Sequence, residues 1–374
     1  MALHMFKNMT NVETISDVVG FLAPLSVTTM KSIKLSTMQK KVDQLIESVY
    51  KPVEFLKYSS DIGVLTTIRT AMYYQKFESI LFASILSIVT CIIFLVASEL
   101  SETGLVMPGQ FPFDETAPWI FQIIFFMQFW TIFLGCIWVG LFDLLLLGLI
   151  RWINVQTSIL QSNYKNCEPT EAKRDNFIVS KETFNRIETY DYFKVTEAQY
   201  KIKVFIPFEI DELNVDNDSF ALRLKSCIKN QKRIVNCINN FNDTFSLTLC
   251  IQIITSNAVT CFYLYQAAWA IKHNKSIIKC CIMFFSVTTE LFYYCIYGTL
   301  LGIQGDALRE SQYNSSWNNY LNREVSNLLI NAMIMSIRPI EMKAGYFFTF
   351  SVQTFISVLQ RAYSFFAILN TMMN

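Results

Sequence analysis

Long stretches without a charged residue are the feature that most constrains this chain. The 20 residues from 79 to 98 contain no Asp, Glu, Lys or Arg, and longer uncharged runs occupy 116–142 and 244–271. A helix of about 20 apolar residues crosses the hydrocarbon core of a bilayer, which is about 30 Å thick. Since 52% of all residues are hydrophobic and only 16% are charged, an ordinary water-soluble fold is not expected. The sequence predicts an all-α membrane protein.

Three more segments complete a predicted set of six spans. The segments 280–305 and 344–374 are equally apolar but are interrupted by Glu290 and Arg361, and the segment 15–30 is short. At a rise of about 1.5 Å per residue, Glu290 would lie about 15 Å inside its span. A carboxylate at that depth must pair or be protonated. Glu290 is therefore expected to make a structural hydrogen bond or to act as a ligand-linked switch.

The distribution of basic residues predicts which loops face the cytoplasm. The segment 31–76 carries eight Lys and Arg residues, whereas 99–115 carries four acidic residues and no basic one. Cytoplasmic loops are enriched in Lys and Arg, which puts 31–76 inside and 99–115 outside. Continuing along the spans puts 151–232 inside and the C-terminus outside. The three lysines of the 272–279 turn, expected outside, run against this assignment.

Motifs of enzymes and metal sites are absent from the sequence. The ten cysteines form no CxxC pair, and the two histidines, His4 and His273, are far apart. No nucleophile elbow, phosphate loop or dinucleotide-binding fingerprint is present. We expect no enzymatic activity, no cofactor, no bound metal and no nucleic-acid partner.

The last 60 or so residues carry the most specific pattern. They read SQYNSSW from Ser311, then RPIEMKAG, then LQRAYSFFAIL, with Tyr363 and Ser364 just before an aromatic and aliphatic tail. A Phe-Pro-Phe-Asp turn also occurs at 111–114, in the predicted outer loop. Together these motifs resemble those of the insect odorant receptor family.

The resemblance implies a fold and a function. Members are seven-helix bundles with an external C-terminus that assemble as tetrameric ligand-gated cation channels. The chain is then expected to be an odorant-specific subunit that binds a small volatile apolar ligand, in a heterotetramer with odorant co-receptor subunits and surrounded by membrane lipid. Its location would be the plasma membrane of olfactory sensory neurons, as a multi-pass protein. A gustatory receptor-like channel and a metabotropic seven-helix receptor are the alternatives.

Matching the family's helices also divides the chain. Six spans are counted where the family has seven, and the first helix is the one expected to be missing. Apolar residues recur at helical spacing from Leu222 to Phe241, which predicts an extension of the fifth helix. Asp143 is expected beyond the bilayer, solvated or in an inter-helix contact. The expected regions are helices 2 to 4 with the outer loop (1–151), the cytoplasmic segment with that extension (152–243), helices 5 and 6 (244–305), a cytoplasmic anchor (306–343) and the pore-lining last helix (344–374).

A receptor for volatile molecules needs an enclosed apolar cavity with a few polar groups. The outer halves of three spans supply aromatic, aliphatic and amide side chains suited to such a cavity. Ordinary helix packing is the alternative role for each of them. The candidate ligand-binding residues are Cys91, Phe94, Leu95, Phe121, Ile124, Phe125, Gln128, Phe262, Tyr263 and Gln266.

One face of the last helix is the candidate pore lining. Residues at spacings of three and four mix Ser and Thr with aliphatic side chains, which suits a narrow water path. By resemblance, the hydrophobic constriction is at Ile368, with Ser364, Thr371 and Met372 on the same face. Arg361 shares that face and would oppose cations, so a face packed on lipid or another helix is the alternative. Acceptor sequons at Asn8 and Asn274 are expected on the outer side.

Overall fold

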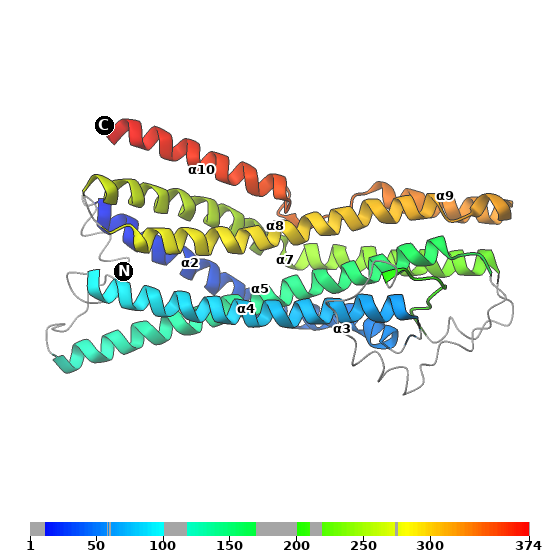
Figure 1. Ribbon diagram of the computed structural model, residues 1–374, viewed down its shortest axis with the longest axis horizontal. Coiled ribbons are helices and arrows are strands. Elements are labelled where there is room, and N and C mark those ends of the chain that lie inside the picture. The colour runs from blue at the N-terminus through cyan, green and yellow to red at the C-terminus, as the bar shows by residue number, and fades with distance from the viewer. Residues whose placement is uncertain are drawn as a thin grey trace.

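A computed structural model describes residues 12–57, 59, 61–100, 118–169, 200–209, 219–273 and 276–373. Long helices run side by side in an elongated bundle (Figure 1). The elements in chain order are α2 (Val12–Thr37), α3 (Gln39–Leu56), α4 (Ile62–Leu100), α5 (Pro118–Lys165), α7 (Phe220–Lys272), α8 (Ile278–Tyr313), the 3-10 helix η5 (Trp317–Tyr320), α9 (Arg323–Ile337), β1 (Lys343–Ala344), β2 (Phe348–Thr349) and α10 (Val352–Met373).

Several helices are far longer than a membrane is thick. The 48 residues of α5 and the 53 residues of α7 reach about 72 Å and about 80 Å at about 1.5 Å per residue. Within the described part of the chain, α5, α7 and α8 are long and apolar enough to cross a membrane. The helix α7 continues unbroken from Phe220 to Lys272, so the apolar residues from Leu222 to Phe241 belong to the same helix as the uncharged run 244–271.

The helix ends follow local sequence signals. Ser219 precedes α7, and its hydroxyl accepts a hydrogen bond from the Leu222 amide at 3.3 Å. Asn322 precedes α9, and its side chain accepts from the Val325 amide at 2.7 Å. Such caps satisfy amide groups that have no partner inside the helix. They explain why both helices begin where they do.

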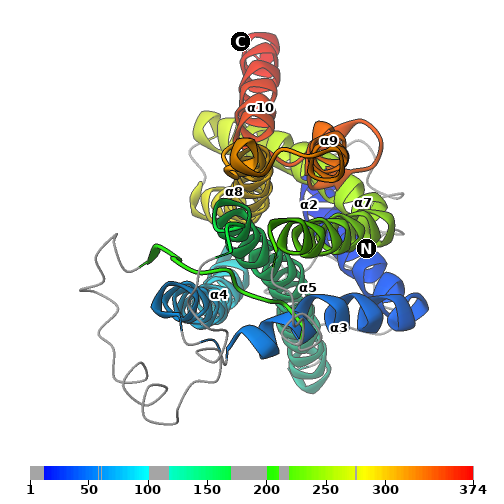
Figure 2. The same cartoon turned by 90° about the vertical axis from the view of Figure 1, so that its right-hand side faces the viewer.

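The helix α5 lies in the middle of the bundle, among α2, α3, α4, α7 and α8 (Figure 2). A continuous apolar core surrounds its second half. Val49 of α3, Ile150 of α5, Phe241 of α7 and Leu301 of α8 all belong to this core and are inaccessible to solvent. Close packing of this kind contributes most of the stability of a helix bundle.

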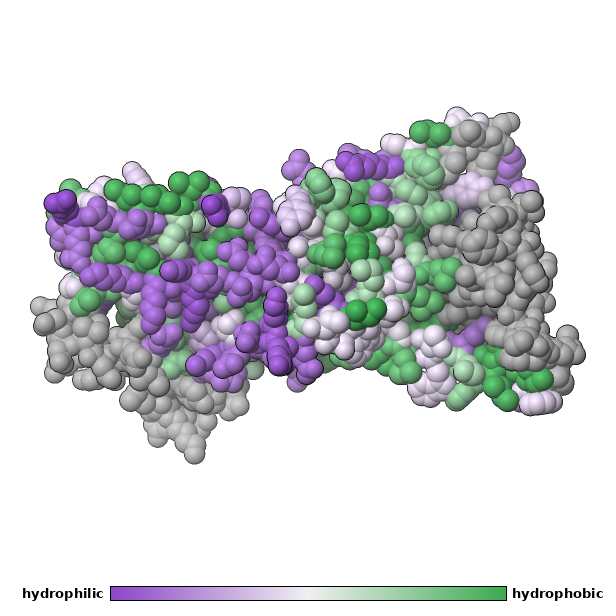
Figure 3. Space-filling view, turned by 180° about the vertical axis from the view of Figure 1, so that it is seen from behind, coloured by the Kyte–Doolittle hydropathy of each residue, from purple (hydrophilic) through white to green (hydrophobic). Residues whose placement is uncertain are grey.

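The two halves of the bundle differ in surface chemistry. Hydrophilic side chains gather over the half that carries α3 and α9, and hydrophobic ones over the other half (Figure 3). In the apolar half, large side chains such as Trp119, Phe126 and Phe285 are more than 60% exposed. Exposed apolar surface of this extent is typical of a face that contacts lipid or another protein. The apolar half is thus the part suited to a bilayer.

The predicted last span from Ala344 is partly wrong. Helix α10 begins at Val352, and the preceding residues form an antiparallel hairpin in which Lys343 pairs with Thr349 and Ala344 with Phe348. The reason is the turn at Gly345, whose φ of +66° suits glycine and interrupts a helix. The Asn242 amide of α7 holds the hairpin by donating to the Glu341 carbonyl at 3.0 Å and accepting from the Lys343 amide at 2.9 Å.

Three expectations fall on residues outside the described ranges. They are the Phe-Pro-Phe-Asp turn at 111–114 and the sequons at Asn8 and Asn274.

The predicted span at 78–99 falls within the 39-residue helix α4, and the weakest candidate, at 15–30, falls within α2. Both segments are therefore helical, as predicted.

The chain leading into α10 makes a close main-chain contact with α8. A Cβ atom added to Gly298 would overlap the carbonyl oxygen of Phe350. Such an overlap cannot be relieved by rotating a side chain, because the colliding atom belongs to the backbone. Gly302, one turn further along α8, has no atom within 4 Å of its added Cβ.

We predict that Gly298→Ala destabilises the protein by about 1–3 kcal/mol through overpacking. The control Gly302→Ala should be neutral or stabilising by up to about 1 kcal/mol, since alanine favours helix over glycine. The measurement is the thermal unfolding midpoint of purified protein in detergent. Equal midpoints for the two variants would contradict the close approach of Phe350 to α8.

Candidate functional site

The predicted ligand-binding residues of α4 divide into one that the structure describes and two that it does not. Cys91 is exposed. Phe94 and Leu95 lie in α4, but their side chains are outside the described ones. Nothing in the described part of α4 therefore tests the grouping of these three residues.

Two of the candidates on α5 stack along their own helix. The rings of Phe121 and Phe125, one turn apart, stack with centroids 6.0 Å apart. Ile124 is buried and Gln128 is half-buried. These positions suit both a cavity wall and ordinary packing, the two roles that the sequence left open.

The candidates on α7 are more enclosed. Tyr263 is only 3% exposed, and Phe262 and Gln266 are half-buried. The Gln266 side-chain oxygen accepts a long hydrogen bond from the Cys280 thiol of α8, at 3.9 Å. This contact joins α7 to the start of α8.

An apolar cavity of about 230 Å³ lies between α4 and α5. Its wall on α4 includes Phe82, Leu86 and Thr90, and its wall on α5 includes Cys136 and Gly140. The hydroxyl of Thr90 donates to the carbonyl of Leu86 at 2.7 Å, so its oxygen can still accept a hydrogen bond. None of the ten predicted ligand-binding residues is among the described residues that line it. On α4 the lining of the cavity extends to Thr90, the residue next to Cys91 in the sequence.

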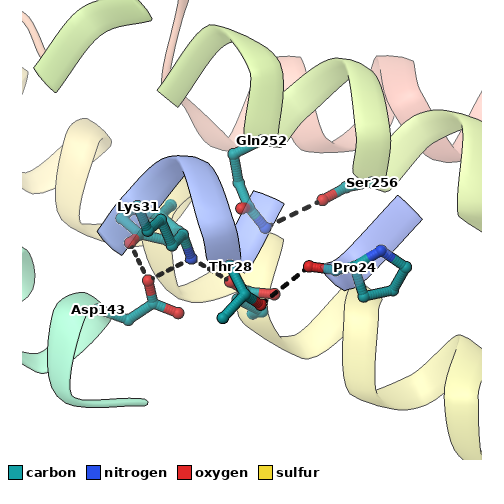
Figure 4. Close-up of polar contacts among 8 residues, drawn as sticks. Pro24, Thr28, Lys31, Asp143, Gln252 and Ser256 are labelled. Carbon is teal, nitrogen blue, oxygen red and sulfur yellow. Dashed lines mark hydrogen bonds and ion pairs between the residues drawn. The ribbon is translucent and has the colours of Figure 1, made fainter. Parts of the chain in front are cut away.

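The strongest polar feature is a cluster of charges buried between three helices (Figure 4). The Lys31 ammonium of α2 donates to Asp143 Oδ1 of α5 at 2.7 Å and to Glu290 Oε1 of α8 at 3.0 Å. The Tyr294 hydroxyl of α8 donates to the same Asp143 oxygen at 2.5 Å. The side chains of Lys31 and Asp143 are each 1% exposed. We call Lys31, Asp143, Glu290 and Tyr294 the lysine cluster.

The geometry of the lysine cluster selects between the alternatives left open for two residues and contradicts two other expectations. Glu290 pairs, as a carboxylate in its position must, and Asp143 makes an inter-helix contact rather than a solvated one. Lys31, counted above with the basic residues of an inner loop, is instead inside α2 and buried. The different depths expected for Glu290 and Asp143 are also wrong, because both bind one ammonium group. Counting residues along each helix separately ignored tilt and the unequal lengths of the helices beyond the bilayer.

A second buried group of charges joins α4, α5 and α8. It lies further along α5 and α8 than the lysine cluster. The Arg151 guanidinium of α5 donates to the carboxylate of Glu78 in α4 and contacts the hydroxyl of Tyr297 in α8. Tyr297 also donates to both Glu78 oxygens, at 2.8 and 2.9 Å. Arg151 is 8% exposed. One cation and one anion balance here, in contrast to the single cation and two carboxylates of the lysine cluster.

The candidate pore face of α10 is open. Ser364 and Ile368 are exposed, the latter by 58%, and they line a shallow groove with Ser357, Gln360, Arg361 and Phe365. Thr371 is exposed as well, and the side chain of Met372 is outside the described ones. The opposite side of α10 packs on the bundle through Val358 and Ala362, which are buried. The predicted face is thus the one that α10 leaves uncovered.

Sequence comparison relates the chain to insect chemoreceptors. A model of the 7tm Odorant receptor family matches residues 5–363. Odorant receptor 33b of Drosophila melanogaster is 25% identical over 39% of this chain and 38% of its own length. Odorant receptor Or1 of Anopheles gambiae is 19% identical over 98% of this chain and 83% of its own length. The chain thus matches less than half of the first relative and most of the second.

Structure comparison agrees on the fold. The olfactory receptor OR5 of Machilis hrabei superposes with a TM-score of 0.72 over 98% of this chain and 84% of its own, at 11% identity. The same receptor in complex with eugenol superposes with a TM-score of 0.69. At this identity the similarity concerns the fold alone. Because the family model covers nearly the whole chain, this protein belongs to the 7tm odorant receptor family.

Proposed function

We propose that this protein is an odorant-specific receptor subunit that binds a small volatile apolar molecule and gates a non-selective cation channel. Membership of the odorant receptor family carries the proposal. The partners are odorant co-receptor subunits, with which the chain forms a heterotetramer in the plasma membrane of olfactory sensory neurons. The function is that of a receptor and not of an enzyme.

Odorant binding is supported by the cavity between α4 and α5. Its volume of about 230 Å³ lies just below the range of about 300–1,000 Å³ found for pockets of drug-sized ligands. Its lining is mostly aliphatic and aromatic, with the Thr90 hydroxyl as a polar group. Dispersion and burial would supply most of the affinity for an apolar ligand, and one hydrogen bond would orient it. The related receptor solved with eugenol is in keeping with this ligand class.

Channel formation is supported by the open face of α10. A helix that buries one side and exposes a mixture of Ser, Gln and aliphatic residues on the other needs either lipid, another protein or water against that face. In a tetramer the four copies of this helix would surround the pore, with Ile368 at the constriction. The cytoplasmic segments 152–243 and 306–343 would hold the subunits together.

The cavity yields a prediction with a matched control. The added Cβ of Gly140 would meet Leu86 at 3.4 Å and Phe82 at 3.8 Å, so a larger side chain there occupies the cavity. Gly140→Val should raise the half-maximal odorant concentration about tenfold, which corresponds to about 1.4 kcal/mol of lost contact. Gly135, on the same helix, has open space around its added Cβ, so Gly135→Val should leave the response unchanged.

The readout is odorant-evoked current in cells that also express the co-receptor, with surface expression measured in parallel. Equal half-maximal odorant concentrations for the two valine variants would show that the odorant does not bind in this cavity. Loss of potency in Phe125→Ala or Tyr263→Ala, with Gly140→Val unaffected, would move the ligand to the outer residues predicted from the sequence.

The pore assignment predicts a leak. A ring of apolar side chains closes a pore by excluding water, so Ile368→Asn should raise the current that flows without odorant. Ile356 is also exposed on α10, by 48%, but lies outside the groove. Ile356→Asn should therefore leave the resting current unchanged. If neither variant alters leak or cation permeability in complexes that contain this subunit, α10 does not line the conduction path.

The proposed orientation puts the C-terminus outside the cell. An epitope tag after the last residue should be labelled by antibody on intact cells that express the protein. The control is a tag inserted in the 171–199 segment, which is proposed to be cytoplasmic and should be labelled only after permeabilisation. The reverse pattern would overturn the assignment.

A further inference from the structure

A small cavity with a mixed apolar and polar lining adjoins the lysine cluster. Its volume is about 70 Å³, and it lies between α2, α5, α7 and α8, with Pro24 and four valines among its lining residues. Lys31 and Glu290 form one part of its wall. The remaining polar groups come from Thr28 of α2 and from Gln252, Thr255 and Ser256 of α7. Since a water molecule takes up about 30 Å³ in the liquid, the space is sufficient for a small ion with a water molecule.

One buried acceptor in the cavity wall lacks a donor. Gln252 is 4% exposed, and its side-chain nitrogen points to Ser256 Oγ at 3.4 Å. Its side-chain oxygen has no hydrogen-bond partner among the described residues. Thr28 donates its hydroxyl hydrogen to the Pro24 carbonyl at 2.9 Å, which leaves the lone pairs of its oxygen available. A buried acceptor without a donor is costly, and both of these groups offer oxygen atoms to a cation.

The charges of the lysine cluster do not balance. One ammonium group serves two carboxylates, so one negative charge is left over when all three groups are ionised. The second oxygen of Asp143 also has no hydrogen-bond partner in the described part of the chain. Burying a net charge between helices is unfavourable unless a counter-charge is present. The Arg151 and Glu78 pair, with one charge of each sign, has no such need.

We propose that this cavity binds a small monovalent cation, Na⁺, which supplies the missing positive charge. The Glu290 carboxylate and the Gln252 side-chain oxygen would be its main ligands, and the hydroxyl oxygens of Thr28, Thr255 and Ser256 would contribute. Hard oxygen ligands suit alkali and alkaline-earth cations. A monovalent ion matches the single excess charge, whereas a divalent ion beside the Lys31 ammonium would reverse it.

The bound ion would join three helices. Thr28 belongs to α2, Gln252 to α7 and Glu290 to α8. Because the ion binds the folded protein only, it stabilises the fold by mass action. The stabilisation should saturate with Na⁺ concentration, unlike a general effect of salt.

The test measures thermal unfolding of the purified full-length protein in detergent at constant ionic strength. N-methyl-D-glucamine chloride is replaced stepwise by NaCl, because the organic cation is too large for the cavity. We expect a saturable rise of the unfolding midpoint by about 2 °C or more. Binding of radioactive Na⁺ to the same protein should saturate over the same concentration range.

Matched variants locate the site. Glu290→Gln balances the cluster at one cation and one anion, so it should fold and lose both the Na⁺-dependent rise and Na⁺ binding. Gln252→Leu keeps the charge but removes the amide oxygen, and should weaken binding about tenfold or more. Glu78→Gln makes the same chemical change in the balanced pair and should keep the full Na⁺ dependence.

Two results would overturn the proposal. Absence of saturable Na⁺ binding and of any Na⁺-dependent midpoint shift in the unmodified protein would show that the cavity holds no cation. The second result is an unfolding midpoint that does not depend on Na⁺ but rises as the pH falls, with no such rise in Glu290→Gln. It would show that a proton, and not Na⁺, neutralises the lysine cluster.

Discussion

A buried ammonium group requires negative partners, and this requirement fixes the relative positions of three helices. Lys31 is inaccessible to solvent and binds carboxylates that are 112 and 259 residues away in the sequence. Removal of one partner from such a group typically costs about 3–5 kcal/mol, since a buried charge is left uncompensated. The helices α2, α5 and α8 are therefore held together at one level of the bundle, and the others pack around them.

The contact between α5 and α8 extends this constraint along the bundle. Tyr294 and Tyr297 are less than one turn apart on α8, and each donates a hydrogen bond to a carboxylate of a different charged group. Their partners on α5 are Asp143, which accepts from Tyr294, and Arg151, which contacts Tyr297. These two residues are about two turns apart. A shift of α8 along α5 by one turn would separate both sets of partners. Polar contacts thus set the register of two helices whose apolar residues alone would tolerate several alignments.

The sequence predicted the helices better than it predicted which residues of different helices contact each other. Uncharged runs and helical spacing identified α5, α7 and α8 because length and periodicity are local properties. They did not show that Lys31 is buried, since a lysine at the end of an apolar segment has the same local pattern as one in a loop. The unmatched carboxylates of Asp143 and Glu290 were the available signal, because each requires a cation. The hairpin before α10 was missed for a similar reason, since its turn depends on Gly345 and on the side chain of Asn242 from α7.

The attachment of α10 has a mechanical consequence. Its base is held by the hairpin and by the Thr299 hydroxyl, which accepts a hydrogen bond from the Val352 amide at 2.9 Å. Beyond Ala362 the described side chains of α10 are mostly exposed, so the far end projects away from the rest of the bundle (Figure 1). The 22 residues of this helix make an arm about 33 Å long. A tilt of about 5° at the base moves the tip of such an arm by about 3 Å, roughly the diameter of a water molecule, so a very small rearrangement inside the bundle is geometrically magnified at its outer end.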